Sequence, residues 1–153
     1  MGTAEPQWLD DDEMAAWLGL IGVAMRLPNA LDRQLRRDAG LTHFEYAVLV
    51  ALTDGPERTQ RMSALAEFVD AALPRLSQVT GRLEQRGLVT RRPDPVDGRI
   101  TLVTLTDDGA ALVATGAPGH VAEVRRLVFD NLTKAQVRQL GEIGRRIEAA
   151  LQG

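Results

Sequence analysis

The chain has 153 residues, 44% of them hydrophobic and 25% charged, which is the composition of an ordinary soluble protein of about one domain. It contains no cysteine, which excludes disulfides, thiolate zinc sites and cysteine nucleophiles, and its two histidines, His43 and His120, are too far apart in sequence to indicate a metal or catalytic site. No apolar run approaches the roughly 18 residues of a membrane span and the acidic N-terminus lacks a signal-peptide pattern, so we expect a cytoplasmic protein without membrane association.

The first predicted helix covers residues 10–40 and begins with an acidic run from Asp10 to Glu13. Carboxylates favour the positive end of a helix dipole, so the run indicates a helix start rather than a metal site. We expect Pro28 to kink or restart this helix and Gly40 to end it. Apolar residues recur at three- and four-residue spacing, which predicts one buried stripe. The stripe consists of Trp17, Ile21, Ala24, Leu27, Leu31 and Leu35.

Two short helices are predicted next. Thr42 and Glu45 have the spacing of a capping box, in which each side chain binds the other's backbone N–H, and the helix that they open should stop at Gly55-Pro56. Ser63 is expected to cap the second helix, which contains Leu65.

A fourth, basic helix is predicted from Leu73 to Arg86, after a turn near residues 70–72. Pro74 is tolerable in its first turn, where one backbone N–H has no partner in any case, and Gly87 should close it. Its inward stripe is predicted to contain Leu73, Leu76, Val79 or Thr80, and Leu83.

After Gly87 the apolar period changes to two, which is typical of strands. Residues 88–90 and 100–105 are alternating and β-branched, and the turn-forming residues 93–98 join them into a hairpin. A short helix, a turn, a basic helix and a hairpin, in this order, predict a winged helix-turn-helix over residues 42–106. Such a unit places one helix in a DNA major groove and its hairpin, the wing, against the neighbouring minor groove or backbone.

Two helices are predicted after the wing. Thr106 should cap the first, which we expect to be interrupted at Gly116 and at Pro118-Gly119. Thr133 and Gln136 form a second capping box, which opens the last helix.

The predicted fold is mainly α with a small β-hairpin wing, in a single domain of residues 1–153. The apolar stripes of the terminal helices exceed what a small winged-helix core can cover, so a two-fold partner is expected to cover them. We therefore interpret residues 10–40 and 107–151 as dimerisation helices and residues 42–106 as the DNA-binding lobe.

The formal net charge of −3 is unevenly distributed. Residues 74–99 carry six arginines against three carboxylates, a local charge of +3, so the remainder carries −6. The local field decides whether a phosphate backbone is attracted, so this segment is the candidate DNA-binding surface.

The candidate DNA contacts are the outward polar residues of the basic helix and the arginines of the wing. Asp97 can hydrogen-bond the guanidinium of Arg99 and aim it at a narrow minor groove, where negative potential is strongest. The alternatives are a solvated amphipathic helix and a turn that Asp97 stabilises while Arg99 stays in solvent. The candidates are Arg75, Ser77, Gln78, Arg82, Arg91, Arg92, Asp97 and Arg99.

The chain resembles the MarR family, the multiple-antibiotic-resistance-type regulators of bacteria. The resemblance rests on five segments, of which the wing and the last are the most specific. They are LTHFEYAVLVAL at 41–52, RMSALAEFV at 61–69, RLSQVTGRLEQRGLVTR at 75–91, DPVDGR at 94–99 and LTDDGAAL at 105–112.

The resemblance implies a homodimer in which the first, fifth and sixth helices interdigitate beneath two winged-helix lobes. Family members bind pseudopalindromic double-stranded operators, usually as repressors, and small ligands often relieve binding. By position, the predicted residues of the basic helix would lie in or beside the major groove and Arg99 in the minor groove. Ala72 and Pro74 depart from the family pattern, which often has a Ser or Thr cap and a polar residue there. The absence of cysteine separates the chain from the thiol-switched branch.

An effector pocket is expected between the dimer helices and the DNA-binding lobe. An anionic aromatic ligand would suit Arg26 or His43 beside an aromatic ring. The alternative is that the aromatic residues belong to the core. The candidates are Trp17, Arg26, His43, Phe44 and Tyr46.

We therefore predict a sequence-specific transcriptional regulator without a cofactor, metal or catalytic site. A winged-helix protein-interaction module and a constitutive DNA binder without an effector are the alternatives. An enzyme is disfavoured because the sequence contains no nucleophile elbow, Gly-rich phosphate loop or zinc-binding H-E-x-x-H motif.

Overall fold

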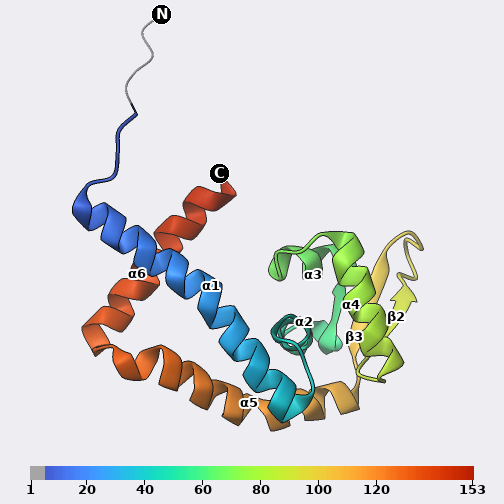
Figure 1. Ribbon diagram of the computed structural model, residues 1–153. Coiled ribbons are helices and arrows are strands. Elements are labelled where there is room, and N and C mark those ends of the chain that lie inside the picture. The colour runs from blue at the N-terminus through green and yellow to red at the C-terminus, as the bar shows by residue number, and fades with distance from the viewer. Residues whose placement is uncertain (1–5) are drawn as a thin grey trace, which may run out of the picture.

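The computed structural model describes residues 6–153 and separates a small lobe from three long helices (Figure 1). The lobe lies beside α1 and above the right-hand end of α5, and α6 crosses behind α1 in this view. The α-helices are α1 Asp11–Ala39, α2 His43–Thr53, α3 Met62–Phe68, α4 Leu73–Gln85, α5 Asp107–Leu127 and α6 Lys134–Gln152. Two 3-10 turns, η1 Pro56–Arg58 and η2 Phe129–Asn131, and three strands, β1 Thr59–Arg61, β2 Val89–Pro93 and β3 Thr101–Leu105, complete the described chain. This architecture confirms the predicted winged-helix fold class.

The helix ends follow the sequence signals closely. Asp10, Thr42 and Thr133 each form a capping box, and Thr106 accepts a hydrogen bond from the N–H of Gly109. The prediction for Ser63 was wrong: α3 already begins at Met62, after Arg61, and no side chain caps it. Ser63 therefore lies inside the first turn.

The prolines and glycines expected to interrupt helices lie inside continuous helices. α1 does not restart at Pro28, and Gly116, Pro118 and Gly119 lie within an unbroken α5. Gly116 is buried, and a Cβ there would lie 3.7 Å from the Cβ of Ala39 and 3.8 Å from the ring of Tyr46. A Cβ at Gly116 would thus make only ordinary contacts, and the packing of α5 on α1 and α2 outweighs the weak helix propensities of these residues.

The wing contains a strand that the sequence analysis missed. The sheet order is β1-β3-β2, all antiparallel, with Gln60 opposite Val103 and Arg91 opposite the same residue on the other side. β1 has only three residues, too few to show an alternating pattern. It becomes a strand because β3 offers it an unpaired edge.

The core of the lobe is built mainly from leucines and valines of α1, α2, α3, α4, β2 and β3. Leu76, Val79, Thr80 and Leu83 are the buried face of α4, as predicted. Leu73 was wrongly assigned to this stripe, because its side chain is 51% exposed. It lies in the first turn of α4, beyond the edge of the core. The largest fully buried core side chains include Leu35, Leu41, Leu49, Leu52, Leu65, Leu76 and Leu83.

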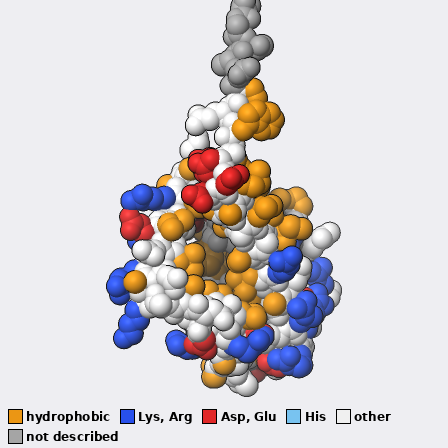
Figure 2. Space-filling model, turned by 60° about the vertical axis from the view of Figure 1, so that its left-hand side comes forward, with side chains coloured by type: hydrophobic (Ala, Val, Ile, Leu, Met, Phe, Trp, Pro, Cys, Tyr) orange, Lys and Arg blue, Asp and Glu red, His pale blue; other side chains and the backbone are white. Residues whose placement is uncertain are grey.

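The long helices leave much of their apolar surface exposed in the protomer. Of the predicted α1 stripe only Leu31 and Leu35 are buried, and no residue of α6 is buried. Figure 2 shows hydrophobic side chains around a hollow on one face of the molecule. A hollow of about 550 Å³ lies between α1, the end of α5 and the start of α6, lined by Leu18, Val23, Leu127 and Leu140 among others.

The apolar character of α1 also corrects a prediction from the sequence. One 18-residue window of this helix has a mean hydropathy of 1.3, and 6% of that window is buried. By length and composition alone α1 is therefore long enough to cross a membrane.

Candidate nucleic-acid interface

α4 presents a polar face with a centre that points away from the core, one flank toward the wing and one flank toward α2. At about 100° per residue, Gln78 and Gln85 lie opposite the buried stripe, Ser77 lies toward the wing, and Arg75 and Arg82 lie toward α2. All five side chains are exposed. The predicted contacts of α4 therefore share one outward surface. Ala72 precedes α4 and provides no side-chain cap, in line with its departure from the family pattern.

Arg75 is held by an aromatic ring. Its guanidinium carbon lies 4.2 Å from the centroid of the Phe44 ring. Phe44 is half-buried and packs against the core, so the ring serves both the core and the arginine. A cation over an aromatic face is attracted by the negative face of the ring.

Arg91 joins the wing to α4 rather than projecting from it. Its Nε donates to Oε2 of Glu84 at 3.0 Å, its backbone N–H donates to Oε1 of Glu84 at 2.9 Å, and its Nη1 donates to the carbonyl oxygen of Ser77 at 3.3 Å. The backbone N–H and the guanidinium of Arg91 together lower the pKa of Glu84. A Cβ at Gly81 would lie 3.5 Å from Nη2 of Arg91, so this glycine lies directly under the guanidinium. Arg91 is thus already partnered, unlike the exposed Arg92.

The tip of the wing has the geometry expected for Asp97 and Arg99. The guanidinium donates two hydrogen bonds to the Asp97 carboxylate, from Nε to Oδ1 and from Nη2 to Oδ2, both at 3.0 Å. The Arg99 side chain is 90% exposed, while that of Asp97 is 35% exposed. Hydrogen bonds from the side chain and then the backbone of Arg99 lower the pKa of Asp97, and the Asp97 carboxylate raises the pKa of Arg99. The wing tip therefore carries a fixed, solvent-facing arginine.

Asp94 stabilises the loop that carries this tip. Its Oδ1 accepts hydrogen bonds from the backbone N–H of Val96 at 2.8 Å and of Asp97 at 3.4 Å. Its Oδ2 lies 4.0 Å from Nη2 of Arg61 on β1. The strand that the sequence analysis missed thus helps to anchor the wing.

The candidate effector residues do not form one site. Trp17 is 49% exposed on α1, and Arg26 lines the apolar hollow. Tyr46 is buried, its ring centroid 4.8 Å from that of His120, and the ring of His43 lies 6.1 Å from the same histidine. The protomer therefore does not bring these residues together, because Arg26 lies at the apolar hollow while the rings of His43 and Tyr46 lie beside His120 of α5.

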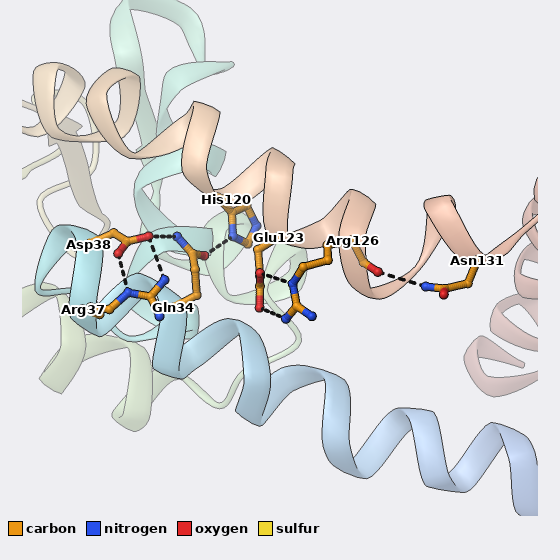
Figure 3. A network of polar contacts seen from close by, with 7 residues as sticks. All are labelled: Gln34, Arg37, Asp38, His120, Glu123, Arg126 and Asn131. Carbon is orange, nitrogen blue, oxygen red and sulfur yellow. Dashed lines mark hydrogen bonds and ion pairs between the residues drawn. The ribbon is translucent and has the colours of Figure 1, made fainter.

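A polar network connects α1 to α5 at this junction (Figure 3). The buried Gln34 donates from Nε2 to Asp38 at 2.8 Å, so its Oε1 accepts from Nδ1 of His120, at 3.1 Å. Burial and then the nearby His43 lower the pKa of His120. Arg37 completes the cluster with a 2.8 Å hydrogen bond to Asp38. Sequence reasoning missed this network, because His120 is more than 80 positions away from the three residues of α1.

Within residues 6–153 no three His, Asp or Glu side chains are grouped so that they could hold a metal ion. The polar groups described above form a surface for contact, with the fixed arginine of the wing beside the polar face of α4. Such a surface suits a large anionic partner.

Comparisons with known proteins identify the family. The sequence model described as MarR family matches residues 39–100. Among curated relatives, transcriptional regulator HosA of Escherichia coli O111:H- is 38% identical over 78 residues, which cover 51% of this chain and 56% of HosA. The transcriptional repressor NicR of Pseudomonas putida is 35% identical over 99 residues, or 65% of this chain and 61% of NicR. The chain thus spans little more than half the length of these relatives.

The match to a solved structure extends over nearly the whole chain. Sco3205, a MarR family transcriptional regulator from Streptomyces coelicolor crystallised in complex with DNA, superposes with a TM-score of 0.94 and 43% identity, covering 99% of this chain and 94% of Sco3205. The three matched proteins named here are all transcriptional regulators rather than enzymes. With this identity and coverage, the chain belongs to the MarR family and is a transcriptional regulator with a DNA-binding fold.

Proposed function

We propose that the protein is a homodimeric repressor that binds a pseudopalindromic operator. The observation that carries the proposal is the fixed Arg99 at the wing tip beside the polar face of α4. Arg75, Ser77, Gln78 and Arg82 enter or flank the major groove, and Arg99, oriented by Asp97, enters the minor groove. Arg92 contacts the phosphate backbone, and Arg91 fixes the wing on α4.

The exposed apolar surfaces of the long helices support the dimer. A lone helix cannot keep such a stripe in water, so residues 10–40 and 107–151 bury it against a second copy, and residues 42–106 form the DNA-binding lobe. This pairing also accounts for the apolar length of α1 without a membrane, which is consistent with the proposed location in the cytoplasm. The NicR relative is named a repressor, which favours repression over activation.

A small anionic or aromatic ligand relieves operator binding in this proposal. The two candidate positions are Arg26 in the apolar hollow and His43 with Tyr46 beside His120. A ligand that binds better to one spacing of the two lobes shifts the protein toward that spacing by its differential affinity. Substituted benzoates are suitable probes, with thermal shift and operator release as the two readouts. An effector-free DNA binder would show neither.

The first experiment titrates the purified protein onto labelled DNA from upstream of its own gene and onto a scrambled duplex, at several salt concentrations. We expect the upstream duplex to be bound at least about 1,000-fold more tightly at physiological salt, as for specific regulators. Equal, weak binding that fades with salt would indicate only an electrostatic contact and would contradict the proposal. An absence of binding even at low salt would favour the protein-interaction module.

A further inference from the structure

The flank of α4 that faces α2 carries three arginines. Arg75, Arg82 and Arg86 recur at spacings that place them on this one side of the helix. Two of them meet the first turn of α2. Arg75 lies over the Phe44 ring at 4.2 Å, and Nη1 of Arg86 lies 3.8 Å from Oε2 of Glu45.

We propose that Phe44 is a positioning residue for DNA recognition, which holds the guanidinium of Arg75 in place at the edge of the DNA-facing surface of α4. The inference rests on the proposed DNA-binding role of that surface. Arg75 itself makes the contact, and Phe44 acts through it.

The kind of partner that Phe44 offers is the first argument. Arg91 is held by the carboxylate of Glu84, which neutralises its charge. An aromatic ring holds an arginine by its face and leaves the positive charge uncompensated for a phosphate. The ring has no oxygen or nitrogen acceptor, so the N–H groups of the guanidinium remain available for hydrogen bonds to another partner. Within residues 6–153 the Arg75 guanidinium makes no hydrogen bond or ion pair, and the Phe44 ring lies 4.2 Å from its carbon.

The rigidity of Phe44 is the second argument. Its turn is fixed by the Thr42–Glu45 capping box, with distances of 2.9 Å in both directions. The next N–H along, that of His43, donates to Oδ1 of Asp32 on α1 at 2.9 Å. The ring is therefore attached to a turn that is tied to a long helix, and so is a fixed platform for a long, flexible side chain.

Holding Arg75 in place before binding reduces the entropy that its side chain loses when DNA binds. Immobilising a free arginine on binding weakens affinity by roughly two- to ten-fold, and a side chain already held by a ring avoids most of that loss. In the proposed dimer both protomers carry the contact, so the effect on operator affinity is the square of the factor for one protomer.

The test uses the full-length protein and a duplex that the wild type selects from a random-sequence pool. Phe44→Leu keeps an apolar side chain but removes the ring, whereas Phe44→Tyr keeps the ring. We expect Phe44→Leu to weaken binding by about four-fold or more, and Phe44→Tyr to bind as the wild type does. In an Arg75→Ala background, Phe44→Leu should cause no further loss. Thermal unfolding of each variant separates this effect from lost packing.

The possible failures are distinguishable. If wild type selects no sequence, the proposed function is wrong and the inference falls with it. If Arg75→Ala binds as tightly as the wild type, Arg75 makes no contact and the inference is overturned while the proposed function stands. If Phe44→Leu weakens binding equally with and without Arg75, the ring has only a structural role, which also overturns the inference.

Discussion

Gly109 lies where α5 leaves the wing, and its replacement by alanine should destabilise the fold. A Cβ at this position would lie 2.2 Å from the carbonyl oxygen of Leu88 and 2.6 Å from Cδ1 of Leu105, where real contacts are not shorter than 3.0 Å. The Leu88 carbonyl is backbone and accepts the N–H of Thr106 at 3.1 Å. The N–H of Gly109 is itself held by the Thr106 hydroxyl at 3.0 Å. The alanine can therefore fit only if a strand end or the helix start moves.

The expected cost follows from these contacts. Overpacking in a closed site costs about 1–3 kcal/mol, and a weakened hydrogen bond to Leu88 or Thr106 adds about 1 kcal/mol. The better helix propensity of alanine returns at most about 1 kcal/mol. We expect Gly109→Ala to lower the free energy of unfolding by about 1–3 kcal/mol and the melting temperature by about 2–12 °C.

Gly81→Ala is the matched control for this experiment. Gly81 is likewise a helical glycine, but its Cβ would make only an ordinary contact with the guanidinium of Arg91, at 3.5 Å. This variant should gain about 0.5–1 kcal/mol of stability. Urea unfolding followed by circular dichroism, at one protein concentration for all variants, measures both. A Gly109→Ala protein as stable as Gly81→Ala would refute the reasoning, because it would show that the junction of wing and α5 can shift without cost.

Four further outcomes are expected. Arg99→Ala should weaken operator binding and leave the melting temperature nearly unchanged, because its side chain is 90% exposed; undiminished affinity, by fluorescence anisotropy, would dismiss the wing contact. Gln78→Ala should change sequence preference in a selection experiment, and an unchanged preference would place base readout elsewhere on α4. Light scattering should give a dimer for the wild type and a monomer for Leu140→Glu, which lies in the apolar hollow; a monomeric wild type would contradict the proposed assembly. Folding lowers the pKa of His120, so the unfolded chain binds a proton at this imidazole more readily than the folded chain does. The free energy of unfolding should therefore fall as the pH drops below about 6.5 toward the pKa of the folded state. His120→Gln should flatten that dependence in pH-dependent unfolding, and a wild-type curve flat over this range would argue against the effect.

The local signals in the sequence were sufficient for most helices and for the wing tip. Capping boxes such as Thr42–Glu45 involve residues three apart, and the Asp97–Arg99 clamp joins residues two apart. In both cases the partners are brought together by a single turn, whatever the rest of the fold does. The resemblance to the MarR family was recognisable for the same reason, because its motifs are short and contiguous.

Contacts between distant elements were decided by the tertiary structure. β1 exists because β3 has a free edge, and α5 runs unbroken through Gly116 and Pro118 because its packing on α1 and α2 outweighs local propensity. The contact between Arg75 and the Phe44 ring joins residues that are 31 positions apart, and no sequence motif links them. The separation of Arg26 from His43 depends on which faces of α1 and α2 turn toward α5. Short-range hydrogen bonds are encoded where they form, whereas the choice between competing faces is made only when the whole chain packs.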